Sequence, residues 1–261
     1  MRLIRKILIK ILGLKGYLKL VSSTYIKFIR MGLMKKKYGE LYFVNKVLNE
    51  GDTAVDIGAN LAYYSYFMSR NIGKSGQLYA VEPIPLFADI WKKNMAGHGA
   101  YNVKLFNCAL GNETKESVKM SIPIVNGMVR HGLTKVVENA DLNEAVLSFD
   151  VPMKVADDLM SGEAIQRLDF VKCDVEGYEQ YVIPSLKQSI EKFKPMFQIE
   201  LGGKENRESV VDFLVNLGYD IFILEDQLLN SIQKNDIFSL SQDFYFIHKD
   251  EIEKRKTLIR K

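Results

Sequence analysis

A glycine turn that follows a short apolar segment is the clearest chemical feature of the sequence Val55-Asp56-Ile57-Gly58-Ala59-Asn60. Glycine lacks a Cβ atom and tolerates left-handed backbone angles, so Gly58 lets the backbone approach a ligand closely. Asp56 places negative charge where a phosphate site needs neutral donors or positive charge. We therefore expect the ligand at this turn to be a cation or a neutral polar group.

A second carboxylate, Glu82, ends the next apolar segment along the chain. In a parallel α/β sheet, ligands collect outside the carboxyl ends of the strands, where a carboxylate can accept both hydroxyls of a ribose. A dinucleotide site shares this layout but requires Gly-x-Gly-x-x-Gly at the turn, and Gly58 stands there alone. S-adenosylmethionine carries an ammonium, a sulfonium and a ribose, and is therefore the expected cofactor.

The segment Asn107-Cys108-Ala109-Leu110 closes a third apolar run and would lie near the edge of an adenine. The alternative is a strand end that is merely filled with small apolar residues. Cys108 has no histidine or basic cluster beside it in sequence to lower its pKa, so we expect no nucleophilic thiol.

The densest cluster of residues that could do chemistry is Lys172-Cys173-Asp174-Val175-Glu176-Gly177-Tyr178-Glu179. Asp174 is expected to end a fourth strand and Glu200 a fifth, so that their carboxylates converge on one cleft. Converging carboxylates cannot all stay ionised at their ordinary pKa, so one can act as a base; together they could also bind Mg²⁺. Glu179 either joins this cleft or only complements the dipole of the helix that it opens. Lys172 is interpreted as a surface partner and Cys173 as a core residue.

Apolar runs alternate with amphipathic stretches from residue 40 onward, which is typical of parallel strands joined by helices in an α/β fold. The predicted strands are Thr53–Ile57, Gln77–Val81, Val103–Asn107, Phe170–Asp174, Pro195–Glu200, Asp220–Leu224 and Phe244–His248. The predicted helices are Ala62–Arg70, Pro85–Met95, Tyr178–Lys192 and Arg207–Leu217.

Residues 111–155 interrupt this alternation. Val118–Pro123 and Phe149–Met153 are predicted strands, with the polar segment Asn126–Ser148 between them. An insertion of this length is usually functional, as a lid or a substrate loop. It carries two candidate functional side chains, Arg130 and His131.

The 261-residue chain has an ordinary globular composition, but its charge is distributed unevenly. Residues 1–39 contain eleven Lys or Arg and no acid, and residues 254–261 contain five more. The remainder carries 20 basic residues against all 32 acidic ones, a net charge of −12. Basic ends indicate an anionic partner, either a membrane surface or a nucleic acid. The two cysteines indicate no disulfide framework, so a reducing, cytoplasmic setting is expected.

Helical spacing in the first twenty residues gathers apolar side chains on one face and basic side chains away from it. The apolar set is Leu3, Ile4, Ile7, Ile11, Leu14 and Leu18, and the basic set is Arg2, Arg5, Lys6 and Lys10. This pattern is typical of an interfacial membrane anchor, while its lysines exclude a membrane span. Peripheral contact with the inner face of a membrane through residues 1–20 and packing of the helix on the protein's own body are equally compatible with it. We therefore divide the chain into a basic helical segment (1–39), a main domain (40–250) and a basic tail (251–261).

Six motifs, in order and at sensible spacing from about residue 52 to 225, resemble those of the FkbM-type methyltransferases: VDIGANLAYYS, VEPIPLFADIWKKN, CALGN, ADDLM, DFVKCDVEGYEQYVI and QIEL. The resemblance implies a Rossmann-like class I methyltransferase fold with a seven-stranded, mostly parallel sheet. It also implies S-adenosylmethionine as cofactor and O-methylation, typically of sugars in glycans or secondary metabolites.

The same resemblance implies that Asp56, Gly58, Ala59, Asn60, Glu82, Pro83 and Ala109 contact the cofactor. Asn107 and Cys108 join this set because of their place at the end of the third apolar run. Asp174, Glu176 and Glu179 would line the methyl-transfer cleft, and Glu200 and Arg130 are further candidates for substrate binding. The usual second glycine of the cofactor loop is Ala62 here, whose methyl group would crowd and weaken the cofactor contact.

The implied reaction is an in-line attack of a substrate hydroxyl on the sulfonium methyl, to which orientation contributes much of the rate. A sugar hydroxyl is hardly acidic, so a base should take its proton. Asp174 or Glu176 is the first choice for this base, and His131 from the insertion is the second.

Two other functions stay open beside an O-methyltransferase of a glycan or glycolipid. A nucleic-acid methyltransferase is favoured by the basic ends but disfavoured by the acidic body and by the lack of an Asn-Pro-Pro-Tyr-like or Pro-Cys string. A membrane-associated binding or scaffold protein with a degenerate cofactor site is favoured by Ala62 and the amphipathic N-terminus.

Overall fold

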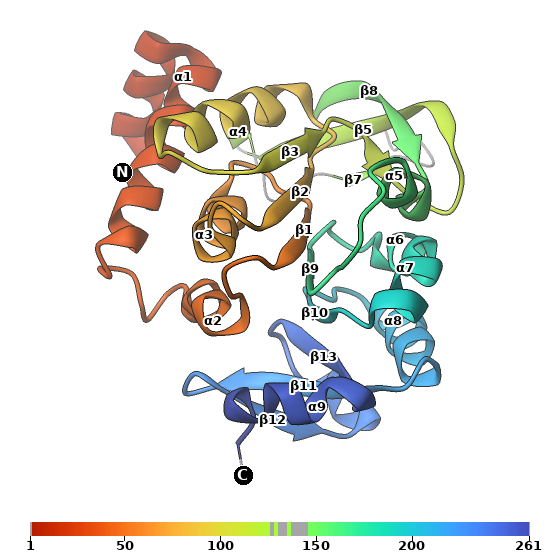
Figure 1. The fold of residues 1–261 in the computed structure, drawn as a ribbon. Coiled ribbons are helices and arrows are strands. Elements are labelled where there is room, and N and C mark those ends of the chain that lie inside the picture. Colours follow the sequence, from red (N-terminus) through yellow and green to blue (C-terminus); the bar gives the residue numbers. More distant parts are fainter. Residues whose placement is uncertain (1, 126–127, 130–134, 137–145, 261) are drawn as a thin grey trace.

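The computed structural model describes residues 2–125, 128–129, 135–136 and 146–260 (Figure 1). An eight-stranded sheet has the order β12-β11-β13-β10-β9-β1-β2-β3. Its strands are β1 (Thr53–Ile57), β2 (Gln77–Val81), β3 (Val103–Phe106), β9 (Phe170–Cys173), β10 (Met196–Ile199), β11 (Tyr219–Glu225), β12 (Leu228–Ile232) and β13 (Phe244–His248). The five strands from β3 to β10 are parallel, whereas β13, β11 and β12 pair antiparallel. This architecture confirms the predicted α/β fold.

All seven predicted strands are present, but the sheet gains an eighth, β12, that the sequence analysis missed. β12 returns from β11 through a two-residue turn at Asp226 and Gln227, with φ of +50° and +64°. Tight hairpin turns of this kind usually carry glycine or asparagine. Neither residue is present at this turn, so the sequence lacked the signal that marks a hairpin.

Nine helices are found in the described residues. They are α1 (Arg2–Arg30), α2 (Gly39–Val47), α3 (Tyr63–Ile72), α4 (Pro85–Gly97), α5 (Ala156–Gly162), α6 (Glu179–Val182), α7 (Lys187–Phe193), α8 (Lys204–Asn216) and α9 (Ile252–Arg255). The single helix predicted over Tyr178–Lys192 is divided into α6 and α7 by a 3₁₀ turn at Pro184–Leu186. Pro184 has no N–H to donate, so it cannot continue the backbone hydrogen-bond ladder of α6, which accounts for the break even though Ile183 before it keeps helical angles (φ −62°, ψ −45°).

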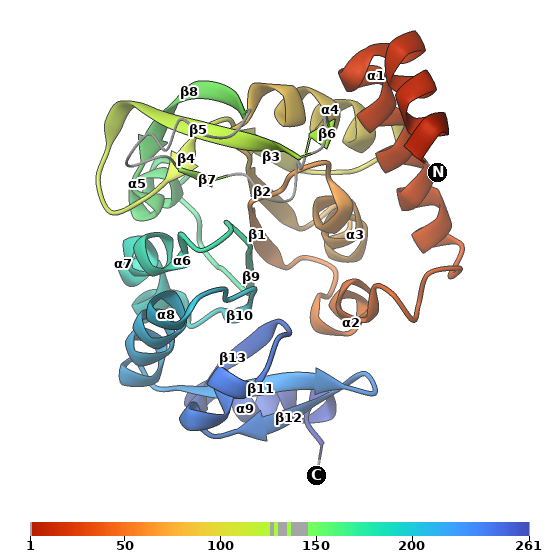
Figure 2. The same cartoon turned by 180° about the vertical axis from the view of Figure 1, so that it is seen from behind.

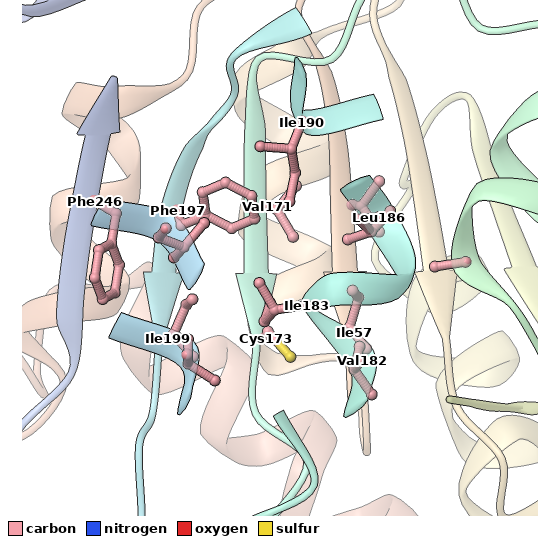
Figure 3. Packing of buried hydrophobic residues seen from close by; sticks show 14 of the residues in the cluster. Ile57, Val171, Cys173, Val182, Ile183, Leu186, Ile190, Phe197, Ile199 and Phe246 are labelled. Carbon is pink, nitrogen blue, oxygen red and sulfur yellow. The ribbon is translucent and has the colours of Figure 1, made fainter. Parts of the chain in front are cut away.

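Both faces of the sheet are covered by helices. On one face, Val182, Ile183 and Leu186 pack with strand residues such as Val171 and Phe197 (Figure 3). On the other face, α2 and α3 contribute buried side chains to a second cluster. The strand ends between these layers are where the predicted site residues gather.

The insertion forms a small second sheet, as its two predicted strands suggested. Its strands are β4 (Ala109–Leu110), β5 (Lys115–Val125), β6 (Met128–Val129), β7 (Lys135–Val136) and β8 (Val146–Lys154). The long strands β5 and β8 pair antiparallel, and β4 joins β8. This sheet therefore lies directly beyond the end of β3.

The N-terminal helix α1 packs beside α4, as both views show (Figures 1 and 2). Leu18, Ile26 and Ile29 are buried, and the Asn94 side chain donates a hydrogen bond to the hydroxyl of Ser22 (2.8 Å). A bend at Gly13, with φ +66° and ψ +170°, divides the helix. The single continuous apolar face expected from the sequence is therefore wrong. No described helix has an apolar stretch long enough to cross a bilayer.

The basic C-terminal residues do not form a separate tail. Arg255 donates hydrogen bonds to the carbonyl oxygens of Val47 (2.8 Å) and Asp169 (3.2 Å). Leu258 is buried, and Lys254 pairs with Glu251 (2.7 Å). The described part of this segment is packed on the main domain, and acidic neighbours offset much of its charge.

Candidate active site

Gly58 holds the turn after β1 against two neighbouring strands. The N–H groups of Gly58 and Ala59 both donate to the carbonyl oxygen of Val81 at the end of β2 (3.0 Å each). A Cβ atom added at Gly58 would lie 1.9 Å from the carbonyl oxygen of Asp174, which follows β9. With φ at +80° as well, only glycine fits at this point.

Ala62 stands where the resemblance noted from the sequence implied a glycine. Its φ is +76°, a left-handed angle that costs an alanine about 1–2 kcal/mol. The methyl group is buried within the cluster beneath α3. An alanine at position 62 therefore strains the backbone. From the sequence, we expected its methyl group to crowd the cofactor.

Glu82 lies at the end of β2, where the ribose carboxylate was expected. Its two oxygens accept hydrogen bonds from the N–H groups of Asn60 (2.8 Å) and Ile84 (2.7 Å). Burial raises the pKa of Glu82 to about 8, although both hydrogen bonds lower it. The Asn107 side chain fixes the backbone here by donating to the carbonyl oxygens of Glu82 (2.7 Å) and Pro83 (2.9 Å).

Asp56 lies within β1 and is buried beneath α3, rather than exposed at the strand tip. Its carboxylate accepts a hydrogen bond from the Ser65 hydroxyl, which in turn accepts one from the Trp91 indole (2.7 Å). The other oxygen, Oδ1, is buried and has no hydrogen-bond partner among the described residues. Asp56 and Glu82 are close enough that the charge on Asp56 helps raise the pKa of Glu82.

Cys108 and Ala109 are both buried where the chain passes from β3 into β4. Burial raises the pKa of the Cys108 thiol to about 11. The thiol therefore stays protonated at neutral pH, which agrees with the expectation that Cys108 is no nucleophile. Contact of either residue with an adenine stays a prediction.

Lys172 is a buried lysine next to the end of β9. It is 3% exposed, donates to the Asp174 carboxylate (2.8 Å), and lies 4.9 Å from the centre of the Tyr64 ring. Burial alone would lower the pKa of Lys172, but nearby carboxylates, Asp174 foremost, raise it above its ordinary value. The interpretation of Lys172 as a surface residue is therefore wrong; Cys173, in contrast, is the buried core residue that was predicted (Figure 3).

Two polar residues beside Lys172 were missed in the sequence analysis. Gln198 pairs with Lys172 in the register of β9 and β10, and its amide donates to Asp243 (2.7 Å) and to the hydroxyl of Tyr64 (2.9 Å). Asp243 precedes β13, and because β13 runs antiparallel, its start lies at the edge where β10 ends. The direction of β13 could not be inferred from the order of the segments.

Glu200 follows β10 and lies near Asp174. Its N–H donates to the carbonyl oxygen of Cys173 (3.1 Å), which aligns the two strand ends. The residue is exposed, but its carboxyl group is partly enclosed. This enclosure and the charges of Asp174 and Asp243 raise the pKa of Glu200 to about 7, while Lys172 lowers it. Glu176, in the loop after β9, has a left-handed φ of +56°.

Glu179 supports the loop after β9 from inside the protein. Its side chain is fully buried and accepts hydrogen bonds from the N–H groups of Val175 (2.9 Å) and Gly177 (3.1 Å). The Asn206 amide, from α8, donates to the same carboxylate (2.6 Å). From the sequence, Glu179 either lined the cleft as a substrate-binding residue or complemented the dipole of its helix; these hydrogen bonds instead make it a positioning residue for the loop.

Arg130 and His131 lie outside the described residues. Among the residues that the structure does describe, no three His, Cys, Asp or Glu side chains gather closely enough to hold a metal ion. The structure therefore gives no support to the Mg²⁺ that the acidic cluster suggested.

The turn and its neighbours fit S-adenosylmethionine in two respects. The unpartnered Oδ1 of Asp56 is an acceptor suited to a cationic group, because a buried acceptor left without a donor is unfavourable. Each oxygen of Glu82 accepts one hydrogen bond and keeps a second lone pair for a ribose hydroxyl. Gly58, Ala59 and Asn60, together with Glu82, are the residues that would hold the cofactor.

Comparison with known proteins identifies a family. The Methyltransferase FkbM domain matches residues 56–221. Methyltransferase sdnD of Sordaria araneosa is 25% identical over 156 residues, which cover 51% of this chain and 60% of that protein. A protein-L-isoaspartate O-methyltransferase of Methanocella arvoryzae is 37% identical over 59 residues, covering 23% of this chain and 31% of its own length. The chain thus spans less than two thirds of either relative.

A solved structure shares the fold. The methyltransferase FkbM from Methylobacillus flagellatus KT superposes with a TM-score of 0.50 at 12% identity, covering 88% of this chain and 58% of that one. The family match begins at Asp56 in β1 and ends at Ile221 in β11, so it includes the carboxyl ends of β1, β2, β3, β9 and β10 but not Asp243 before β13. The chain therefore belongs to the FkbM methyltransferase family.

Proposed function

We propose that this protein is an S-adenosylmethionine-dependent O-methyltransferase whose acceptor is a sugar hydroxyl in a glycan, glycolipid or related metabolite. The observation that supports this most is that Glu82, Asp174 and Glu200 each directly follow a parallel strand, β2, β9 and β10, at the same edge of the sheet. Glu82 suits a ribose, and the other two carboxylates suit an acceptor that carries hydroxyl groups. Membership of the family supports methyl transfer, whereas the sugar is our inference from the resemblance and from these carboxylates.

When bound, S-adenosylmethionine supplies a methyl group made electrophilic by its sulfonium. The protein's own residues bind, orient and deprotonate. Glu82 and the backbone of the Gly58 turn hold the nucleoside, and Asp174 and Glu176 orient the acceptor beside it. Orientation of this kind lowers the barrier by several kcal/mol because no further ordering is needed during the reaction.

The acceptor hydroxyl is a weak acid and needs a base. The Asp174 carboxylate is already engaged in an ion pair with Lys172 (2.8 Å). Glu200 has a pKa of about 7, which suits proton transfer near neutral pH. We therefore propose that Glu200 is the base that accepts the proton of the acceptor hydroxyl, in place of Asp174 or Glu176, which the sequence alone favoured.

The acceptor class is tested by incubating the protein and labelled S-adenosylmethionine with separated glycan, lipid and RNA fractions of the producing organism. Label in a glycan or lipid fraction is the expected result. Label in RNA alone would refute the acceptor class and favour the nucleic-acid alternative. If calorimetry detects no cofactor binding even at millimolar concentration, the protein is a binding or scaffold protein instead.

The base is tested by the pH dependence of turnover. Glu200→Gln should lower kcat by about 10²–10⁴-fold and abolish the rise in rate through about pH 7, with cofactor affinity unchanged. Glu50→Gln, just before β1 at the opposite edge of the sheet, is the matched control. If Glu200→Gln keeps the rise and either Asp174→Asn or Glu176→Gln loses it, the base is the latter residue.

A further inference from the structure

The N-terminal helix presents an apolar surface to solvent. Of the ten large hydrophobic side chains that are exposed in the described residues, eight lie between Ile4 and Leu33. Ile4, Ile7 and Ile11 are 64%, 49% and 71% exposed, and their spacing places them in one stripe along the helix. Extended apolar surfaces of this kind mark sites of interaction in soluble proteins.

The bend at Gly13 explains why this stripe faces outward. In a straight helix, residues 5 and 17 would lie about 18 Å apart along the axis. The Arg5 guanidinium instead lies 5.5 Å from the centre of the Tyr17 ring, so the chain turns back on itself at the bend. After Gly13, Leu18, Ile26 and Ile29 are buried on the protein. Before Gly13 the described part of the helix has no buried apolar side chain, and the stripe is left in solvent.

Positive charge surrounds the stripe. Lys6 and Lys10 are exposed on the same segment, and the chain contains no acid before Glu40. The basic C-terminal residues differ, because Lys254 and Lys256 pair there with Glu251 and Glu253. Of the two basic ends, it is therefore the N-terminal one that combines exposed charge with exposed apolar surface.

We propose that residues 4–12 of α1 bind the surface of an anionic membrane. Isoleucine side chains gain free energy by entering the boundary between headgroups and acyl chains, and lysines gain it beside anionic headgroups. A nucleic acid would pair with the lysines but would leave the three isoleucines in water. The combination of both features on one short helix therefore favours a lipid surface.

The same helix borders the candidate active site. Leu18 belongs to a buried cluster that also contains Leu61, from the turn after β1, and Ile122 of the insertion. Leu14 and Tyr178 pack against that cluster, and Tyr178 follows the acidic loop after β9. A membrane bound by α1 would lie close to the site, so the acceptor would be a lipid-linked glycan. This last step depends on the proposed function, whereas the membrane contact does not.

Flotation with lipid vesicles tests the contact on the full-length protein. The protein should float with vesicles of phosphatidylcholine and phosphatidylglycerol, but not with phosphatidylcholine alone. Replacing Lys6 and Lys10 with glutamine should weaken binding about 25-fold, at roughly fivefold for each lysine. The double variant Ile7→Ser and Ile11→Ser should weaken it by about 100-fold, because both side chains lose apolar surface.

The matched control is Val215→Ser, another exposed apolar residue, on α8, which should float like the unchanged protein. All variants should bind S-adenosylmethionine with unchanged affinity, since none of these residues belongs to the site. Three results would overturn the membrane contact. The isoleucine variant could float as well as the unchanged protein, the protein could associate with itself through the stripe, or it could retain RNA selectively in place of vesicles. If the protein methylates soluble glycans but does not float with vesicles, the membrane contact is refuted and the proposed function stands. If it floats but methylates no glycan, the proposed function is refuted and the membrane contact stands.

Discussion

Replacing Gly58 with alanine should destabilise the protein by about 2–5 kcal/mol. The left-handed φ of +80° costs an alanine about 1–2 kcal/mol. The new methyl carbon would also lie 1.9 Å from the carbonyl oxygen of Asp174. The shortest comfortable contact between carbon and oxygen is about 3.3 Å, so the two backbones must separate by roughly 1.4 Å. Overpacking of this kind costs about 1–3 kcal/mol.

Urea unfolding, followed by extrapolation to water, measures this loss. Gly99→Ala is the matched control because Gly99 also has a left-handed φ, +68°, but nothing lies within 4 Å of an added Cβ. It should lose only the conformational cost of about 1–2 kcal/mol. Equal losses in the two variants would refute the argument that the Asp174 carbonyl determines the glycine at position 58.

The same substitution should affect the reaction more than the control does. Displacing Asp174 by an ångström or more should lower turnover by about 10²-fold, measured at a temperature where the variant is still folded. Turnover equal to that of Gly99→Ala would show that Asp174 does not need its present position.

Three further predictions concern buried charge and are all measured by urea unfolding. Between pH 4.5, the ordinary pKa of Glu82, and about pH 8, its carboxyl group is protonated only in the folded protein. The free energy of unfolding should therefore fall as the pH rises through this interval, by up to about 5 kcal/mol. Glu82→Gln should remove this pH dependence, and an unchanged pH dependence would mean that other groups cause it. Lys172→Met should cost about 3–5 kcal/mol, because it leaves neighbouring carboxylates without their cation, and a neutral result would contradict the buried pair. Glu179→Ala should lower the free energy of unfolding by about 3–5 kcal/mol, because it leaves the loop N–H groups and the Asn206 amide without acceptors. Glu179→Gln should lower it less. Equal losses of stability in the two variants would show that the hydrogen bonds are not the cause.

The parallel part of the fold could be predicted because strands that are buried on both faces appear in the sequence as continuous apolar runs. Thr53–Ile57, Gln77–Val81 and Phe244–His248 were predicted with the bounds that the structure has. β12 was missed because a turn at Asp226 and Gln227 gives no glycine signal. The break in the helix after residue 182 follows from Pro184, which the helical periodicity around it concealed.

The site was predictable where a residue lies at a strand end and its neighbours follow in chain order. Glu82 and Asp174 satisfy this condition. Asp243 does not, because only the antiparallel direction of β13 brings it to the same edge. Lysines are rarely fully buried, and the carboxylates that compensate Lys172 come from three different strands or their ends, so its burial could not be read from the sequence.

Lys172 lies between two carboxylates of the candidate site. Its ammonium is attracted both by Asp174, which follows β9, and by Asp56, which lies beneath α3. A positive charge that settles near Asp56 reduces the attraction from that side and leaves the ammonium more strongly engaged with Asp174. Since such linkage is reciprocal, an acceptor that draws on Asp174 also changes how firmly the first ligand is held. One buried cation thereby couples the charge state on one side of the candidate site to that on the other.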